Sequence, residues 1–309
     1  SFCDMFVNRA WRAGNRGNVA SVLIEKPSVG DFLPLAEGGF DLQYAPVMEM
    51  TAGKGKAIFS QLDISGRTEP EPEALNVFAK LLARLDAPAA KTSRPVFYQG
   101  GKEGKDLLTA LGIPYAEQGK PGTDALLVLG PDSRIEDHAE ALKNGLDILA
   151  IAPGLPSLSA VLKPEELPVA GRWYSDYVNG LAEEPEFQGI SNADLHWRKP
   201  IPLSFSAEGK GGRALRTFKI GKGRLTVCLV APWMFDADQG QYRTSVRRST
   251  FLLSRLLHNL GAPDNIRPLM FDREYLSRRT VLDSGWIGLA DPENKGESLG
   301  FHTPGFRED

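Results

Sequence analysis

Cysteine is scarce in this sequence, which contains only Cys3 and Cys228 among its 309 residues. Two cysteines can supply neither a disulfide framework nor a four-cysteine zinc site. The four histidines are scattered, without the H-x-H or H-E-x-x-H spacing of a metal centre. We therefore expect no bound metal, and no motif calls for a cofactor.

Long apolar runs and an excess of one charge are also lacking. No run approaches the roughly 18 residues that a membrane-spanning helix needs. The net charge is −3, so there is no basic stripe of the kind that binds nucleic acid or an anionic membrane. The sequence does not begin with Met or a signal segment, which we interpret as the mark of a fragment. On that interpretation the sequence does not reveal where the protein is located in the cell. We expect the longer parent protein to be exported, periplasmic or extracellular.

The sequence contains one long unit twice. Residues 221–263 consist of a Gly-Lys-Gly turn, an apolar strand, a polar loop and an amphipathic helix, and residues 53–88 have the same order. The two turns lie 221 − 53 = 168 residues apart, whereas the helix ends, SRLLHNLGAP and AKLLARLDAP, lie 254 − 79 = 175 apart. The polar loop is therefore seven residues longer in the second copy. A repeat of this length indicates a duplicated domain, and we expect each copy to close an α/β domain.

The alternation of strands and helices predicts an α/β fold for the second copy. Apolar strands are expected at 94–99, 124–131 and 147–153, with helices at 101–113 and 135–144 between them. Near-continuously apolar strands separated by helices favour a parallel sheet that is covered on both faces. We predict a complete flavodoxin-like domain over residues 91–265.

The flanking parts are predicted to be incomplete. Residues 1–90 have the pattern of the C-terminal part of a first flavodoxin-like domain, with a helix at 71–85. Residues 266–309 contain turns and aromatic residues but no helical period, which predicts a connector and the first strands of a truncated β-sandwich.

The loop after the strand at 147–153 is the place where flavodoxin-like hydrolases carry a nucleophile. A sharp turn exposes the nucleophile there beside backbone N–H donors. Here the position reads Ala152-Pro153-Gly154, without Cys or Ser, and Pro153 lacks an N–H group. We interpret it as a degenerate elbow and predict no catalytic residue in it; Ser157 and Ser159 follow a second proline and are weaker candidates.

Two other candidate sites have structural explanations. Cys228 lies within an apolar strand, where a cysteine is typically a buried hydrophobe; as a nucleophile it would need a base such as His196 or His258. Residues 98–108 follow a strand and open a helix, but the three-residue spacing of Gly100 and Gly104 does not match a phosphate loop. A weak anion site at the helix N-terminus is the alternative to a plain turn.

Aromatic residues form one more candidate set. Flat rings complement the apolar faces of sugars, so Trp173, Trp197 and Trp233 could form a sugar-stacking surface. The alternative is that these rings pack over the sheet. The acidic pairs Asp236/Asp238 and Glu183/Glu184 are expected to be solvated.

Several stretches resemble a known family. GNRGNVASVLIEKP (14–27), GGFDLQYAPVMEM (38–50), FQGISNADLHWR (187–198) and RRSTFLLSRLLHNLGA are similar to large bacterial glycoside hydrolase-related proteins, often labelled β-galactosidase or family-two-like. Such proteins carry class I glutamine amidotransferase-like domains that lack the catalytic cysteine, which fits Ala152 at the elbow. The tail at 286–306 resembles the start of a galactose-binding-like jelly roll.

The resemblance implies a non-catalytic, architectural part of a carbohydrate-active enzyme. The two carboxylates of a family-two glycosidase lie on a (β/α)₈ barrel of about 250 residues, and no run of eight such units exists here. The implied partners are carbohydrate through the parent enzyme, other domains of the same chain, and a second copy in a homo-oligomer. Two alternatives stay open: an amidase- or esterase-type hydrolase in the second domain, and a sugar-binding module.

Overall fold

A computed structural model describes residues 20, 24–39, 42–52, 55–66, 68–69, 71–87, 93–175, 184–206 and 212–263. All of them belong to one of two compact units, Ser1–Ile266; the other is Arg267–Asp309. The prediction of a β-sandwich start over 266–309 therefore lies outside the described residues, as do Cys3, Glu183 and most of 1–23.

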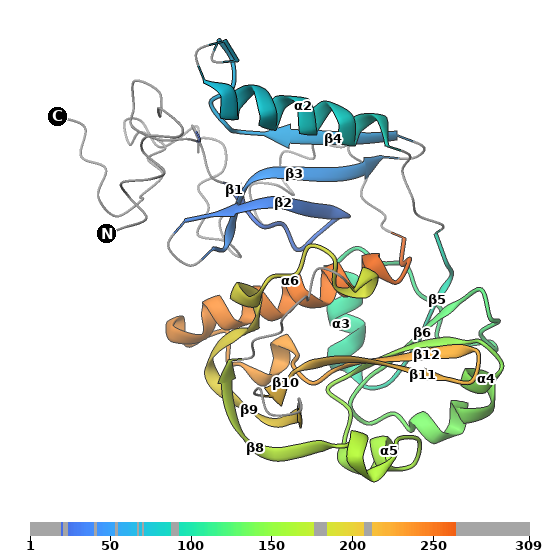
Figure 1. Ribbon diagram of the computed structural model, residues 1–309. Coiled ribbons are helices and arrows are strands. Elements are labelled where there is room, and N and C mark those ends of the chain that lie inside the picture. The colour runs from blue at the N-terminus through green and yellow to red at the C-terminus, as the bar shows by residue number, and fades with distance from the viewer. Residues whose placement is uncertain are drawn as a thin grey trace, which may run out of the picture. The chain divides into compact units, whose positions relative to one another are not determined.

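The described residues form three sheets and five α-helices (Figure 1). The strands are β1 (Ile24–Glu25), β2 (Phe32–Gly38), β3 (Tyr44–Ala52), β4 (Gly55–Ser60), β5 (Val96–Gln99), β6 (Leu126–Leu129), β7 (Asp147–Ile151), β8 (Pro168–Ser175), β9 (His196–Ser206), β10 (Gly212–Arg213), β11 (Leu215–Ile220) and β12 (Gly223–Cys228). The α-helices are α2 (Pro72–Asp86), α3 (Lys102–Ala110), α4 (Ala139–Lys143), α5 (Leu155–Ser159) and α6 (Arg243–Asn259). Short 3₁₀ helices are η1 (Ile135–His138), η2 (Pro164–Glu166), η4 (Pro185–Phe187), η5 (Asn192–Leu195), η6 (Pro232–Met234) and η7 (Gly240–Tyr242).

The central sheet has the order β11-β12-β7-β6-β5. Strands β12, β7, β6 and β5 pair in parallel, while β11 joins β12 in an antiparallel hairpin. Every residue of β6 and β7 is buried. This agrees with their continuously apolar sequences, which predicted a sheet covered on both faces. The α/β class and the parallel pairing are thus confirmed for this part of the chain.

Helices cover both faces of this sheet. One core cluster combines residues of α3 and α6, among them Leu108, Leu252 and Leu256, and the other includes Leu142 of α4 and Leu158 of α5. Figure 1 shows α3 and α5 on opposite sides of the sheet. The carboxyl ends of β5, β6 and β7 therefore meet at one edge of a rigid, packed layer, where open α/β sheets bind ligands.

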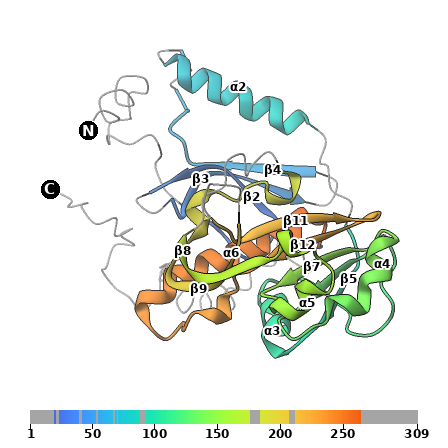
Figure 2. The same cartoon turned by 60° about the horizontal axis from the view of Figure 1, so that its bottom comes forward.

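A second sheet, β10-β9-β8, was not anticipated by the sequence reasoning. Its long strands are antiparallel, with Pro168 opposite Phe205 and Ser175 opposite His196, and two register shifts bend β8. The stretch between α5 and β11 thus adds a layer beside the parallel sheet, visible in Figure 2 as the β8–β9 pair. Its strands escaped prediction because prolines and polar residues interrupt their alternation.

The first copy of the repeat builds a wholly antiparallel sheet in the described residues. Strand β3 pairs with β1 and β4 along one edge and with β2 along the other. The expected strand and helix are present as β4 and α2, but β4 pairs with β3 in a hairpin and not with a parallel strand. The two copies share a hairpin followed by a helix: β3–β4–α2 and β11–β12–α6.

Candidate functional site

The turn at Ala152-Pro153-Gly154, predicted to be a degenerate elbow, has a strained backbone. Ala152 follows β7 directly and has φ of 48°, in the left-handed region, which costs an L-residue about 1–2 kcal/mol. Its N–H donates to the carbonyl of Cys228 at 2.7 Å, which ties the turn to the end of β12. Non-glycine residues hold such a conformation where the surrounding structure enforces it, and such positions cluster at functional sites.

The rest of the elbow offers little chemistry. Pro153 is buried and carries no N–H, and Gly154 precedes α5, a helix of only five residues. The side chain that the turn presents, that of Ala152, is a methyl group, which neither attacks a substrate nor transfers a proton. The structure thus shows a strained strand-to-helix turn that carries no nucleophilic side chain.

Ser157 and Ser159 both serve the local backbone. The Ser157 hydroxyl accepts the N–H of Ile135 at 2.8 Å and lies 3.2 Å from the carbonyl of Ser133, so it fastens the start of η1 to α5. The Ser159 hydroxyl donates to the carbonyl of Pro156 at 2.9 Å. Both hydroxyls are held by these bonds in structural positions.

Cys228 is fully buried, and its thiol donates to the carbonyl of Val230 at 3.1 Å. Burial raises the pKa of this thiol to about 12, so it carries no thiolate at neutral pH. His258 is also buried, with Nδ1 3.2 Å from the carbonyl of Ala262, whereas His196 is exposed at the start of β9. In the described part of the chain, no hydrogen bond joins Cys228, Ser157 or Ser159 to a histidine.

The glycines of residues 98–108 make room for a tyrosine. Tyr98 is buried and its hydroxyl donates to the carbonyl of Gly101 at 2.9 Å. A Cβ on Gly104 would lie 2.2 Å from that hydroxyl, and one on Gly100 would lie 2.5 Å from it. Packing around Tyr98 thus explains the glycines that resemble a phosphate loop. This packing does not indicate an anion site at the N-terminus of α3.

The three tryptophans do not form one stacking surface. Trp197 is 4% exposed, so its ring has no face for a sugar, which corrects its place among the candidates. Trp173 is half-buried over Gly171, whose Cβ would lie 2.4 Å from the ring, and Trp233 is half-buried against the same core cluster. Among the described residues the Trp197 indole N–H has no hydrogen-bond acceptor.

A polar pair that the sequence did not predict lies at the carboxyl edge of the parallel sheet. His138 Nε2 lies 2.8 Å from Oε1 of Gln99, the last residue of β5, and the Ser133 hydroxyl donates to the Gln99 carbonyl at 2.6 Å. Burial lowers the pKa of His138, which favours the neutral ring. Their positions in the sequence were the available signal: Gln99 ends β5, and Ser133 and His138 follow the neighbouring parallel strand β6.

A buried charge cluster joins the first sheet to α6 and was also missed. Lys26, between β1 and β2, pairs with Glu37 and, at 2.8 Å, with Asp194 of η5, which is 2% exposed. Glu25 pairs with Arg247 of α6 at 2.8 Å. Of these groups, all but Glu37 line a cavity of about 20 Å³, room for about one water molecule. Each acidic group of the cluster has a basic partner, so the cluster holds the first sheet, η5 and α6 together.

Metal and membrane features are absent from the described residues. No group of three or more His, Cys, Asp or Glu side chains gathers there in a way that could hold an ion. Asp236 accepts the N–H of Asp238 at 3.1 Å in a polar loop, and Glu184 lies 3.8 Å from the half-buried Arg213. No helix in the described ranges has the length and apolar character to cross a bilayer.

Comparisons with known proteins add no relative. No family model matches the chain, and neither a curated protein nor a solved structure matches it. Function is therefore inferred from the residues and from the geometry described above.

Proposed function

We propose that this chain is a non-catalytic, architectural region of a carbohydrate-active glycoside hydrolase-like protein. The non-catalytic role is supported by Ala152. This residue occupies a strained turn at the carboxyl edge of the parallel sheet and has a methyl group where a nucleophile would stand. The flavodoxin-like, amidotransferase-related assignment of residues 91–265 belongs to the same proposal. It is supported by the parallel order β12-β7-β6-β5 and by helices on both faces.

The carbohydrate-active part of the proposal rests on the resemblance of the quoted motifs. The described residues lack a (β/α)₈ barrel on which a pair of carboxylates could flank a glycosidic bond. In this proposal the carboxylates lie elsewhere in the parent protein, and this region packs against the domain that carries them.

Reactive probes test the absence of an active site. A fluorophosphonate and iodoacetamide are applied to the folded chain and, separately, to the chain in denaturant, and the adducts are mapped by mass spectrometry. We expect no adduct on Ser157, Ser159 or Cys228 in the folded chain, and alkylation of Cys228 after unfolding because its thiol is buried. Stoichiometric labelling of one of these residues in the folded state would restore the amidase or esterase alternative.

A ligand-binding role at the same edge is the second candidate. The pair of Gln99 and neutral His138 offers a donor and an acceptor to a polar ligand at the carboxyl edge of the sheet, as sugar hydroxyls or an amide would require. Titration of galactose and of glutamine, followed by the NMR signals of the Gln99 side-chain amide and of the backbone amides around it, tests it. Saturable shifts that vanish in His138→Ala support binding; unchanged spectra at millimolar ligand contradict it.

A further inference from the structure

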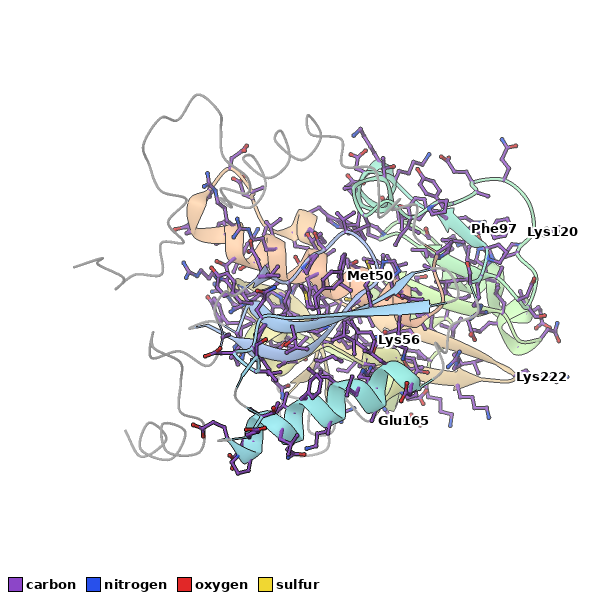
Figure 3. All side chains as sticks on the ribbon, turned by 90° about the horizontal axis from the view of Figure 1, so that it is seen from above. Met50, Lys56, Phe97, Lys120, Glu165 and Lys222 are labelled. Atoms are coloured by element: carbon purple, nitrogen blue, oxygen red, sulfur yellow. The ribbon has the colours of Figure 1, made fainter. Side chains whose placement is uncertain are left out.

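Helix α2 exposes an apolar stripe. Its inner side, which includes the buried Ala74, runs along β4, whereas Leu75, Phe78, Leu82 and Leu85 are between 41% and 51% exposed. Their spacing of three, four and three residues puts them on one line of the helix, the pattern of a helix that packs against a partner. Figure 3 shows no described element against the side of α2 that faces away from β4 and Lys56.

The duplicated helix shows what such a stripe does when it is covered. At the offset of 175 given by the matching helix ends, Phe78 corresponds to Leu253, Leu82 to Leu257 and Leu85 to Leu260. Leu253 and Leu257 of α6 and Leu260, which caps its C-terminus, are 0%, 0% and 5% exposed. The same positions are therefore interior in one copy and at the surface in the other.

The elements that cover the stripe in the second copy have no counterpart beside α2 among the described residues. Leu253, Leu257 and Leu260 belong to the core cluster that also contains Leu107 and Leu108 of α3 and residues of β5 and β7. Strand β7 pairs in parallel with β12, the strand that precedes α6. In the part of the chain that the structure describes, by contrast, β4 pairs only with β3, and Phe59 on β4 is 41% exposed.

We propose that the exposed stripe of α2 and the second edge of β4, together the α2–β4 face, bind a segment of the kind that runs from β5 through α3 and β6 to β7. Its last strand, the counterpart of β7, extends the sheet in parallel with β4. The helix that corresponds to α3 packs its leucines on Leu75, Phe78, Leu82 and Leu85. The occupant is a further segment of the same polypeptide, because the repeat places the matching segment of the second copy ahead of its own β12 and α6. This inference does not depend on whether the parent hydrolyses glycosides.

Thiol accessibility tests the proposal in two forms of the protein. Phe78→Cys, in a Cys3→Ser background, is made in the 309-residue chain and in the complete gene product expressed from its own gene with a C-terminal affinity tag. Val169→Cys on β8 is the control, because Val169 is 50% exposed. We expect Phe78→Cys to react with a maleimide at least about tenfold more slowly in the complete gene product, as burial in stable structure requires. The control reacts equally in both forms.

Two results would overturn the proposal. Equal reactivity of Phe78→Cys in both forms would show that the α2–β4 face stays bare. Protection already present in the 309-residue chain, together with a dimeric mass by light scattering, would assign the face to a second copy. Hydrogen exchange of the α2 amides in the unsubstituted proteins gives the same comparison without a variant: slower exchange in the complete gene product supports the proposal, and identical exchange contradicts it.

Discussion

The backbone N–H of Ala152 donates to the carbonyl of Cys228 across 2.7 Å, so the turn that follows β7 is held by the last residue of β12. This bond explains how an alanine is kept at φ of 48°. The parallel register places Cys228 opposite Ile151, and the chain must turn at once to enter α5. The strain is thus imposed by the sheet, whether or not a reactive group stands in the turn.

Relief of this strain should stabilise the fold. Glycine adopts positive φ without steric cost, so Ala152→Gly should raise the free energy of unfolding by about 0.5–1 kcal/mol. Ala160→Gly is the matched control, because Ala160 is exposed at φ of −76° and glycine there should cost up to about 1 kcal/mol. Urea denaturation followed by circular dichroism measures both. A loss of stability in both variants would show that the left-handed turn is not strained.

Asp147 at the start of β7 makes stability depend on pH. Its carboxylate accepts from Arg94 at 2.7 Å and from Arg224 at 2.8 Å. Burial alone would raise the pKa of Asp147, but the hydrogen bonds from Arg224 and Arg94 outweigh it and the pKa is lowered. A lowered pKa in the folded state gives stability that is present above the unfolded pKa, about 4, and is lost as the pH falls through the folded value.

Asp147→Asn should therefore cost roughly 2–3 kcal/mol at pH 7. The difference from the unsubstituted protein should shrink as the pH is lowered below about 4. Denaturant titrations over a series of pH values measure it. Asp137→Asn is the control, since Asp137 is an exposed partner of Arg134 and should change stability by less than about 0.5 kcal/mol. A pH-independent difference would contradict the assignment.

Arg255 couples the first sheet to α6. It is 1% exposed, pairs with Asp31 and donates to the carbonyl of Phe32 at 2.8 Å. Arg255→Met keeps the volume but removes these bonds, and should cost about 3 kcal/mol or more, as the loss of one partner of a buried ion pair does. Hydrogen exchange should then show β2 and β3 opening before β6 and β7. The exposed Arg243 gives the control, Arg243→Met, for which we expect no such uncoupling.

Gly104 is required by Tyr98 and not by a ligand. Because a Cβ at position 104 would lie 2.2 Å from the Tyr98 hydroxyl, Gly104→Ala should destabilise the fold by about 2–3 kcal/mol through overpacking. A Cβ on Gly240 would meet no described atom within 4 Å, so Gly240→Ala should stay within about 0.5 kcal/mol. Thermal unfolding of the two variants decides the matter. Equal behaviour would reopen a functional role for the glycines.

Local pattern determined the elements of the central sheet. The apolar runs predicted at 94–99, 124–131 and 147–153 contain β5, β6 and β7, and the helix expected at 71–85 is α2, Pro72–Asp86. The identity of the elbow, Ala152-Pro153-Gly154, could also be read directly from the chain. These features depend on hydrophobic periodicity and on residue type within a few positions, which a sequence displays.

Only the tertiary structure decided how distant segments meet. The β8–β9 pairing, the Gln99–His138 pair and the contact of Arg255 with Asp31 join residues that no local pattern connects. The same limit explains α2: its sequence predicted an amphipathic helix, but the exposure of Phe78 and the burial of its counterpart Leu253 follow from which neighbours are present. The sequence determined which faces are apolar, and the packing of non-local elements decided which of those faces are covered.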